Sequence, residues 1–259
     1  MEVVMNKTFC FICAVIFFLY PNTAFAHDFT KQEILEVLNE VNPNVEYATI
    51  LNNCVLLENP SEDSKSIANI CENTKVEILE DKTTIWYRVR NIVTDEIGWL
   101  KREHLEIPIE LKSEKILMSK ESIEKYAKIL NFQSNTKYFI WVDLKRQVVN
   151  ILEGENGNFQ LSKVILCSSG KAESPTLKGF FEIQERGVWF YSERLKSGAQ
   201  FWVRFHGSYL FHSIPMDKSK KVIDETIGER SSSGCIRMKV PDAEWFYNNI
   251  PDGTAVFIQ

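Results

Sequence analysis

The sequence lacks several features that would point to common classes of protein. Positive charge is not in excess, because 30 Lys and Arg residues stand against 35 Asp and Glu residues, for a net charge of -5. A mildly acidic chain with mixed charges offers no electrostatic footprint for nucleic acid. There is no Cys-x-x-Cys pair and no cluster of histidines, so the sequence supplies no convincing set of zinc ligands. We therefore predict no metal and no organic cofactor.

Long apolar runs are also scarce, and the one that stands out lies at the N-terminus. Residues 1–26 contain Lys7, then an almost uniformly apolar stretch from Thr8 to Tyr20, then the small-x-small pattern Ala24-Phe25-Ala26. This order predicts a secretory signal peptide. The apolar stretch is shorter than the roughly 20 residues that a membrane helix requires, although an uncleaved anchor is the alternative. We expect a secreted or cell-envelope protein (cell wall or periplasm), with no membrane span after cleavage.

Cysteine is limited to six residues, two of which, Cys10 and Cys13, lie in the predicted signal. Cys54 and Cys71 either form a disulfide, which secretion permits, or are two small buried side chains. Cys167 ends an apolar strand and is expected to be packed in the core.

Residues 44–107 are predicted to form a small domain of short strands. Apolar residues alternate there with a period of two, which is typical of half-buried strands: Val76, Ile78, Ile85, Tyr87 and Val89. We expect a turn between the strands at Asp81-Lys82-Thr83. Three segments resemble those of bacterial SH3-like barrels: Val55-Leu56-Leu57, Trp86-Tyr87-Arg88-Val89 and Gly98-Trp99-Leu100. The resemblance implies a module that either binds wall peptides or spaces and orients a second domain.

Two helices are predicted outside the strand-rich segments. One covers residues 31–41. The other is a helical connector within residues 115–132, where Ser119 is a suitable N-cap and Ile123, Tyr126, Ala127 and Leu130 recur on one face.

Residues 137–259 are predicted to form a second, mainly β domain. Asn156-Gly157 predicts a hairpin turn, since both residues tolerate a positive φ. A short helix over Asp242–Asn248, a Pro251-Asp252-Gly253 turn and a strand over 255–258 close the chain. We predict a β-sandwich with long loops, where functional sites usually lie.

The most informative stretch is Ser232-Ser233-Gly234-Cys235-Ile236-Arg237, which follows His212-Ser213. Glycine allows the backbone to approach a ligand closely. A thiol needs a base, because the thiolate is the nucleophile and an unassisted cysteine is mostly protonated at neutral pH. His212 can supply that base if the fold closes the gap in sequence. The stretch therefore predicts a catalytic site.

The second domain resembles the catalytic domain of L,D-transpeptidases, the cysteine enzymes of bacterial peptidoglycan. Besides the two motifs above, the resemblance is carried by Ile140-Trp141-Val142, Gln147-Val148-Val149, Ser174-Pro175-Thr176-Leu177-Lys178-Gly179-Phe180-Phe181 and Asn249-Ile250-Pro251-Asp252-Gly253-Thr254. It implies an acyltransferase that cleaves a tetrapeptide stem after its diamino acid and releases D-alanine. The acyl group is then joined to the side-chain amine of a second stem.

The resemblance and the chemistry together imply a role for each motif residue. Cys235 attacks the scissile carbonyl, and His212 is its base, with Ser213 orienting the imidazole. His206 is a second candidate base, whereas His104 is expected to be structural. The backbone amides of Ser233, Gly234 and Cys235 are the expected oxyanion donors.

Further residues are candidates for the substrate groove: Ser232, Tyr209, Trp202, Tyr191 and Arg237. Arg237 either pairs with a structural carboxylate or holds a substrate carboxylate. One departure from the family is Ser233, because most members have histidine at this position. The departure puts the level of activity in question.

Three functions remain open from the sequence. The favoured one is a transpeptidase that acts on peptidoglycan stem peptides. The second is an L,D-carboxypeptidase on the same fold, in which water replaces the acceptor amine. The third is a non-catalytic wall-binding protein. A papain-like protease is disfavoured, because its cysteine precedes its histidine.

Overall fold

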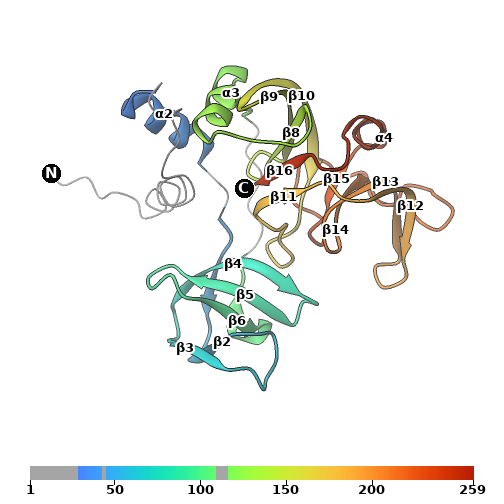
Figure 1. The fold of residues 1–259 in the computed structure, drawn as a ribbon. Coiled ribbons are helices and arrows are strands. Elements are labelled where there is room, and N and C mark those ends of the chain that lie inside the picture. Colours follow the sequence, from blue (N-terminus) through green and yellow to red (C-terminus); the bar gives the residue numbers. More distant parts are fainter. Residues whose placement is uncertain (1–28, 43–44, 109–115) are drawn as a thin grey trace.

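The computed structural model describes residues 29–42, 45–108 and 116–259. The predicted signal peptide, residues 1–26, lies outside the described residues. Figure 1 shows two β-sheets as separate bodies, with the helices α2 and α3 beside the larger sheet. Strands far outnumber helices, so the prediction of a mainly β protein is confirmed.

The N-terminal sheet has seven strands in the order β3-β2-β6-β5-β4-β1-β7. Its elements are β1 (Tyr47–Ile50), β2 (Cys54–Leu57), β3 (Ser66–Ile70), β4 (Lys75–Lys82), β5 (Trp86–Asn91), β6 (Ile97–Lys101), the 3-10 turn η2 (Arg102–His104) and β7 (Leu105–Glu106). All paired strands are antiparallel. Alternate residues of these strands, including Val76, Ile78, Tyr87 and Val89, form its apolar core.

Two details of this sheet differ from the predicted pattern. Ile85 lies in the turn after β4 and is 55% exposed, because the turn is built from Thr83 and Thr84, both with positive φ, rather than from residues 81–83. Glu77 is buried although it lies between the core residues Val76 and Ile78. Its carboxylate is covered because it faces Arg90 and Lys178, the latter from the loop before β11.

The helices α2 (Lys31–Val41) and α3 (Lys120–Ile129) pack on the larger sheet rather than on the N-terminal one. Thr30 caps α2 through a capping box with Glu33, and Ser119 caps α3 by accepting from the amide of Ser122, as predicted. The buried Arg146 side chain donates to the carbonyls of Glu40 and Ile116. The segments that lead to and from the N-terminal sheet are thereby held against the larger sheet.

The larger sheet has nine strands in the order β11-β16-β8-β9-β10-β15-β14-β13-β12. They are β8 (Tyr138–Asp143), β9 (Val148–Glu155), β10 (Asn158–Ser168), β11 (Gly179–Glu182), β12 (Arg186–Ser192), β13 (Ser197–His206), β14 (Tyr209–Ser213), β15 (Ile236–Met238) and β16 (Ala255–Ile258). The helix α4 (Val240–Asn249) precedes β16 and contacts β13 and β14. The predicted turn at Asn156-Gly157 is present, with positive φ at both residues.

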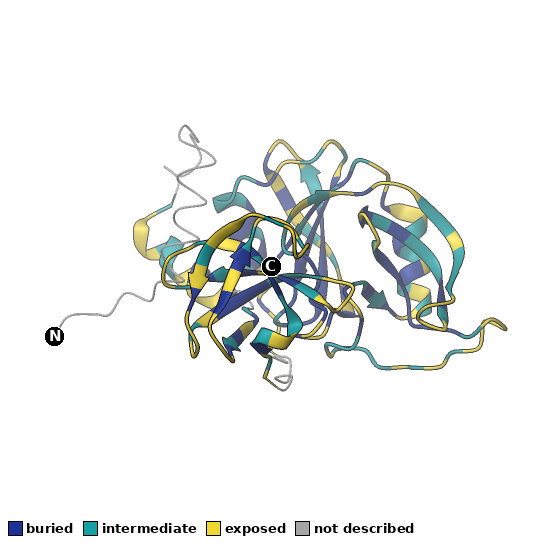
Figure 2. Ribbon diagram, turned by 90° about the horizontal axis from the view of Figure 1, so that it is seen from below, coloured by how far each residue is buried: buried dark blue, intermediate teal, exposed yellow. Residues whose placement is uncertain are grey.

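One core joins the two halves of this sheet. Ile140, Val149 and Ile165 of the first half pack in the same cluster as Phe205 and Phe211 of the second. Figure 2 shows that buried residues follow the strands, whereas exposed residues follow the loops and the outer sides of the helices. The first and second halves meet where β10 pairs with β15 at Cys167 and Met238. Cys235 stands directly before β15, so the sheet positions it.

Candidate active site

Two parallel strands bring the predicted nucleophile and base together. In β14 and β15, Phe211 is paired with Ile236 and His212 with Arg237. Cys235 extends this register by one residue and so lies beside Leu210. Side chains alternate between the two faces of a strand, so His212, Cys235 and Arg237 lie on one face, with His212 and Cys235 as diagonal neighbours. The gap in sequence is closed by strand pairing.

The His212 side chain is buried, with 6% of the residue exposed. Its Nδ1 lies 2.5 Å from the carbonyl oxygen of Ser213 and must therefore donate to it. This bond leaves Nε2 with its lone pair. Burial, aided by the charge of Arg237 and opposed by the bond to Ser213, lowers the pKa of His212 to about 4. The imidazole is therefore neutral near pH 7 and able to accept a proton.

The Cys235 thiol is half-buried and lies 3.7 Å from the carbonyl oxygen of Ser208. Burial raises its pKa above the usual range. The amide of Leu210 and the charges of Arg237 and Arg204 act in the opposite direction. The resting sulfur is consequently protonated, and its reaction requires a base.

Hydrogen bonds within the turn hold Cys235 in place. The Ser232 hydroxyl donates to the carbonyl of Cys235 at 2.6 Å and accepts from the amide of Gly234 at 3.1 Å. The Thr176 hydroxyl accepts from the amide of Gly170 at 2.9 Å and donates to the carbonyl of Gly234 at 2.8 Å. The loop that carries Thr176 therefore stabilises the turn of residues 232–235, which we call the nucleophile turn.

Gly234 is required by this geometry. Its φ is +106°, and a Cβ atom would lie 2.5 Å from Cε1 of Tyr209. No other residue fits without displacing that ring. Because the amide of Gly234 is already bonded to Ser232, the amides of Ser233 and Cys235 are the better oxyanion candidates.

The hydrogen bonds of Ser213 and Ser232 differ from those that the predicted roles require. The Ser213 hydroxyl accepts from the amide of Gln200 at 2.9 Å and donates to Ile214 at 3.0 Å, so the Ser213 carbonyl, and not its hydroxyl, orients His212. Ser232 is 2% exposed and bonded within the turn, which leaves no surface for substrate. Ser233, in contrast, is exposed.

Arg237 has a structural carboxylate as its partner. One guanidinium nitrogen lies 3.2 Å from Asp224 Oδ2 and 3.4 Å from the hydroxyl of Ser231. The Nε atom is buried without a hydrogen-bond partner among the described residues. Sequence reasoning missed Asp224, which lies in the long loop between β14 and β15 and follows no recognisable motif.

Four candidate residues remain, and each lies outside the turn that carries Cys235. Trp202 is half-buried on β13 against Gly187, with the Arg204 guanidinium 5.5 Å from its ring. Tyr191, also half-buried, lies under the ammonium group of Lys218. His206 is exposed, and its ring lies 5.5 Å from the Phe181 ring at an interplanar angle of 52°. His104 bonds to Asn52, which fits a structural role.

The four described cysteines are all free thiols. Cys54 and Cys71 are unpaired, so the disulfide alternative does not hold in this structure. The alternative of two buried side chains holds for Cys54 and is wrong for Cys71, which is exposed. Cys167 is fully buried in the core, as predicted, and burial raises its pKa. Within residues 29–42, 45–108 and 116–259, no three His, Cys, Asp or Glu side chains gather as a metal site would require. The same residues include no helix of the length and apolarity needed to cross a membrane.

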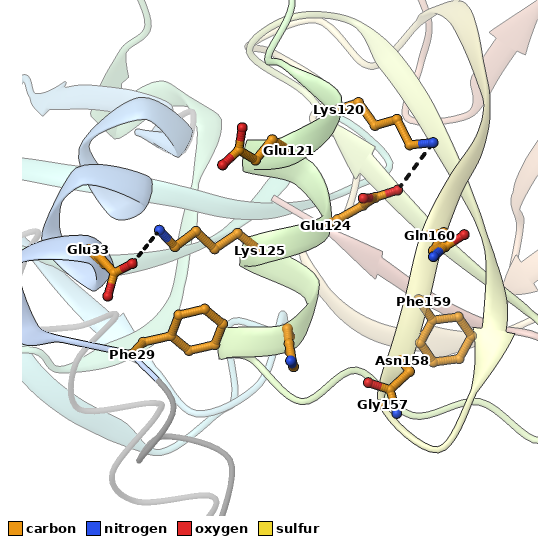
Figure 3. Close-up of a pocket in the computed structure, with 11 residues that line it drawn as sticks. Phe29, Glu33, Lys120, Glu121, Glu124, Lys125, Gly157, Asn158, Phe159 and Gln160 are labelled. Carbon is orange, nitrogen blue, oxygen red and sulfur yellow. Dashed lines mark hydrogen bonds and ion pairs between the residues drawn. The ribbon is translucent and has the colours of Figure 1, made fainter.

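One hollow of about 700 Å³ has a lining that does not include Cys235. Figure 3 shows this hollow between α2, α3 and the turn after β9. Its charged groups neutralise one another, since Glu33 pairs with Lys125 and Glu124 with Lys120. None of the predicted site residues lines it, so we place no chemistry there.

Comparison with known proteins identifies the second domain. Residues 137–258 match the family model of the L,D-transpeptidase catalytic domain, so the resemblance predicted from the motifs is confirmed. A Bacillus subtilis (strain 168) protein named "Putative L,D-transpeptidase YciB" is 43% identical over 130 residues. That match covers 46% of this chain and 65% of the relative, so this chain spans just under two thirds of it.

Two solved structures resemble this chain, with TM-scores of 0.45 and 0.40. A Clostridium acetobutylicum protein described as a fused Zn-dependent amidase/peptidase/peptidoglycan-binding domain-containing protein is 27% identical, with a TM-score of 0.45. The match covers 64% of this chain and 77% of that one. An L,D-transpeptidase from Mycobacterium smegmatis is 13% identical, with a TM-score of 0.40, and covers 83% of this chain and 99% of that one. These scores support no argument about residue roles.

Proposed function

We propose that this protein is an L,D-transpeptidase that cross-links peptidoglycan stem peptides through a thioester on Cys235. The observation that supports the proposal is the parallel pairing of β14 with β15, which aligns His212 with Arg237. Cys235 directly precedes β15, so this register favours a position for its side chain near His212 on the same face of the sheet. The surrounding domain belongs to a family that acts on peptidoglycan peptides.

In the first half-reaction, the Cys235 sulfur attacks the carbonyl carbon of the diamino acid in the donor stem. His212 Nε2 takes the thiol proton as the carbon–sulfur bond forms. The amides of Ser233 and Cys235 stabilise the oxyanion, and the loss of one such donor typically costs about 3 kcal/mol of barrier. The intermediate then breaks its carbon–nitrogen bond, and His212 returns the proton to the departing D-alanine amine.

In the second half-reaction, the side-chain amine of another stem attacks the thioester carbon. His212 accepts the proton that this amine loses as the amide bond forms. The carbon–sulfur bond then breaks, and the proton passes to the sulfur. The thiol and the neutral imidazole are restored, and no redox partner or metal takes part.

The environment of the pair favours proton transfer during attack over a resting ion pair. Burial holds the pKa of His212 low and that of Cys235 high, so a thiolate beside an imidazolium is disfavoured before substrate binds. Cys235 as a whole residue is only half-buried, which is compatible with the approach of a substrate. We assign Tyr209 to the wall of the groove, because its ring contacts the nucleophile turn at Gly234.

Arg237 serves this site mainly through its charge and its pairing. Its bond to Asp224 anchors β15 to the long loop, and its positive charge acts on both His212 and Cys235. We assign Trp202 to the outer part of the substrate groove, on the strand next to β14.

The acylation of Cys235 tests the proposal directly. Incubation with a carbapenem should add one acyl group to the protein by intact mass, and Cys235→Ala should remain unmodified. Absence of the adduct would favour the non-catalytic reading, in which Ser233 marks a loss of function. Incubation with purified disaccharide-tetrapeptide should yield cross-linked dimer. Release of tripeptide without dimer would make the protein an L,D-carboxypeptidase.

We further propose that residues 1–26 direct the protein out of the cytoplasm, because the substrate lies there. N-terminal sequencing of the protein from a secreting bacterial host should find a mature chain that starts near His27. A chain that retains Lys7 would indicate the anchored alternative.

A further inference from the structure

The N-terminal sheet contacts the loop that precedes β11, an edge strand of the larger sheet. The Tyr87 hydroxyl donates to the carbonyl of Glu173 at 2.6 Å, and Arg102 lies 3.5 Å from the Glu173 carboxylate. Lys178, at the C-terminal end of the loop, lies 3.3 Å from the Glu77 carboxylate. The loop is therefore held by the N-terminal domain at its middle and at its C-terminal end.

A second link reaches the segment just before the nucleophile turn. Arg230 donates to the Glu46 carboxylate at 2.5 Å, and both side chains are less than a tenth exposed. The same guanidinium donates through Nε to the carbonyl of Gly170 at 3.0 Å. One arginine thus joins the N-terminal sheet to the strand end that borders the site.

Each of these segments bonds directly to the nucleophile turn. Thr176, within the held loop, donates to the carbonyl of Gly234. Lys171, which follows Gly170, donates its amide to the carbonyl of Ser232 at 3.1 Å. Gly170 and Ser232 also form a parallel bridge. The path from the N-terminal sheet to Cys235 is therefore continuous.

The ion pairs between the two domains involve buried carboxylates, and buried pairs hold the segments that carry them in fixed relative positions. An exposed ion pair contributes little to stability, whereas removal of one partner from a buried pair leaves an uncompensated charge and is strongly destabilising. Glu46 and Glu77 are 6% and 5% exposed. The pair of Lys101 on β6 with Glu62, in the loop between β2 and β3, differs because the Glu62 side chain is largely exposed.

We propose that the N-terminal sheet is a positioning element of the active site, in which Tyr87, Glu77 and Glu46 hold the supports of the nucleophile turn in their reactive arrangement. The proposal gives this sheet a role in the chemistry of Cys235 beyond that of a spacer. It rests on the proposed function for its consequence in catalysis, but not for its structural content.

The test uses the full chain with Tyr87→Phe and Glu46→Gln, and Glu62→Gln as the matched control. Tyr87→Phe removes one hydroxyl and keeps the buried ring. This variant should therefore fold and give an exchange measurement even if Glu46→Gln does not fold. By hydrogen exchange and mass spectrometry, peptides that cover 170–178 and 231–235 should exchange about fivefold faster in the two variants. The control should exchange like the wild type.

A second readout separates positioning from general loss of structure. Carbapenem acylation, which needs placed oxyanion donors, should fall about tenfold. Iodoacetamide alkylation of Cys235, which needs no such donors, should stay within about twofold. Unchanged exchange in Tyr87→Phe overturns the proposal, as does an equal fall of acylation and alkylation. A wild-type protein that is never acylated would sink the proposed function, whereas the exchange result would still decide the positioning role.

Discussion

The two sheets of this protein both bury polar side chains, but they do so in different places. In the larger domain, Ser232 and Thr176 are buried and bond to the turn that carries Cys235, and His212 is buried on the neighbouring strand β14. In the N-terminal sheet, Glu46 and Glu77 are buried against the other domain. Burial of a polar group costs free energy unless the group has a hydrogen-bond or ion-pair partner. Each buried cluster therefore fixes the relative positions of the residues that form it. One cluster fixes the turn that carries Cys235, the proposed nucleophile, and the other fixes the segments that bond to that turn.

The largest effect should come from removal of the base. His212→Ala is expected to lower the acylation of Cys235 about 1,000-fold, because the raised pKa of the thiol leaves little thiolate without a proton acceptor. His206→Ala, which changes an exposed histidine of the same region, should acylate like the wild type. The reverse result, with His206 essential and His212 dispensable, would move the base to the other histidine.

The next effect concerns the turn itself. Gly234→Ala should lower acylation about 100-fold, because the added Cβ meets the Tyr209 ring and displaces Cys235. Gly253→Ala is the matched control, since Gly253 also has a positive φ but its Cβ would meet nothing within 4 Å. Both variants strain the backbone. Equal activities in the two would show that the contact with Tyr209 has no part in placing the thiol.

The pH dependence of acylation should reveal the buried imidazole. A pKa of about 4 keeps His212 neutral above that pH, so the base is present at pH 5 and is lost as the pH falls through 4. Acylation should therefore change less than about threefold between pH 7 and pH 5 and fall steeply below pH 4. The rate of carbapenem acylation measured across this range checks the expectation. A midpoint near 6.5 would mean that the imidazole is solvated.

The smallest effect on chemistry should come from the apolar core of the N-terminal sheet. Ile78→Val removes one buried methyl group and should cost about 1 kcal/mol of stability, seen as a lower melting temperature. Acylation should stay within about twofold, because the interface side chains keep their partners. A large fall in acylation from this variant would show that any loss of stability in the sheet mimics the loss of an interface contact.

Much of the fold could be predicted because its signals are local. The cap at Ser119, the turn at Asn156-Gly157 and the closing strand at residues 255–258 each follow from a few neighbouring residues. Ile85 was predicted wrongly for the same reason: it continues an alternating pattern, but the turn at Thr83 and Thr84 places it in solvent. Alternation indicates which residues can face a core, and the turn decides where a strand begins.

The candidate site divides in a similar way. The residue types and their order in the motifs pointed to Cys235, His212 and the supporting glycine. The hydrogen bond of the Ser213 carbonyl, the bridging role of Thr176 and the pairing of Arg237 with Asp224 were not predictable. These contacts join residues through strand register and loop packing, which depend on the whole domain.

The amino-acid order by itself determined the kinds of chemistry available to this chain: a thiol, an imidazole, a glycine turn and the apolar patterns of two β domains. Only the three-dimensional arrangement decided which groups meet, and in what protonation state. The pairing of β14 with β15 brings the segments that carry His212 and Cys235 together. Burial then lowers the pKa of His212 and raises the pKa of Cys235, so both groups are neutral near pH 7. Desolvation and contact between distant segments arise only when the chain is folded, so no local pattern encodes them.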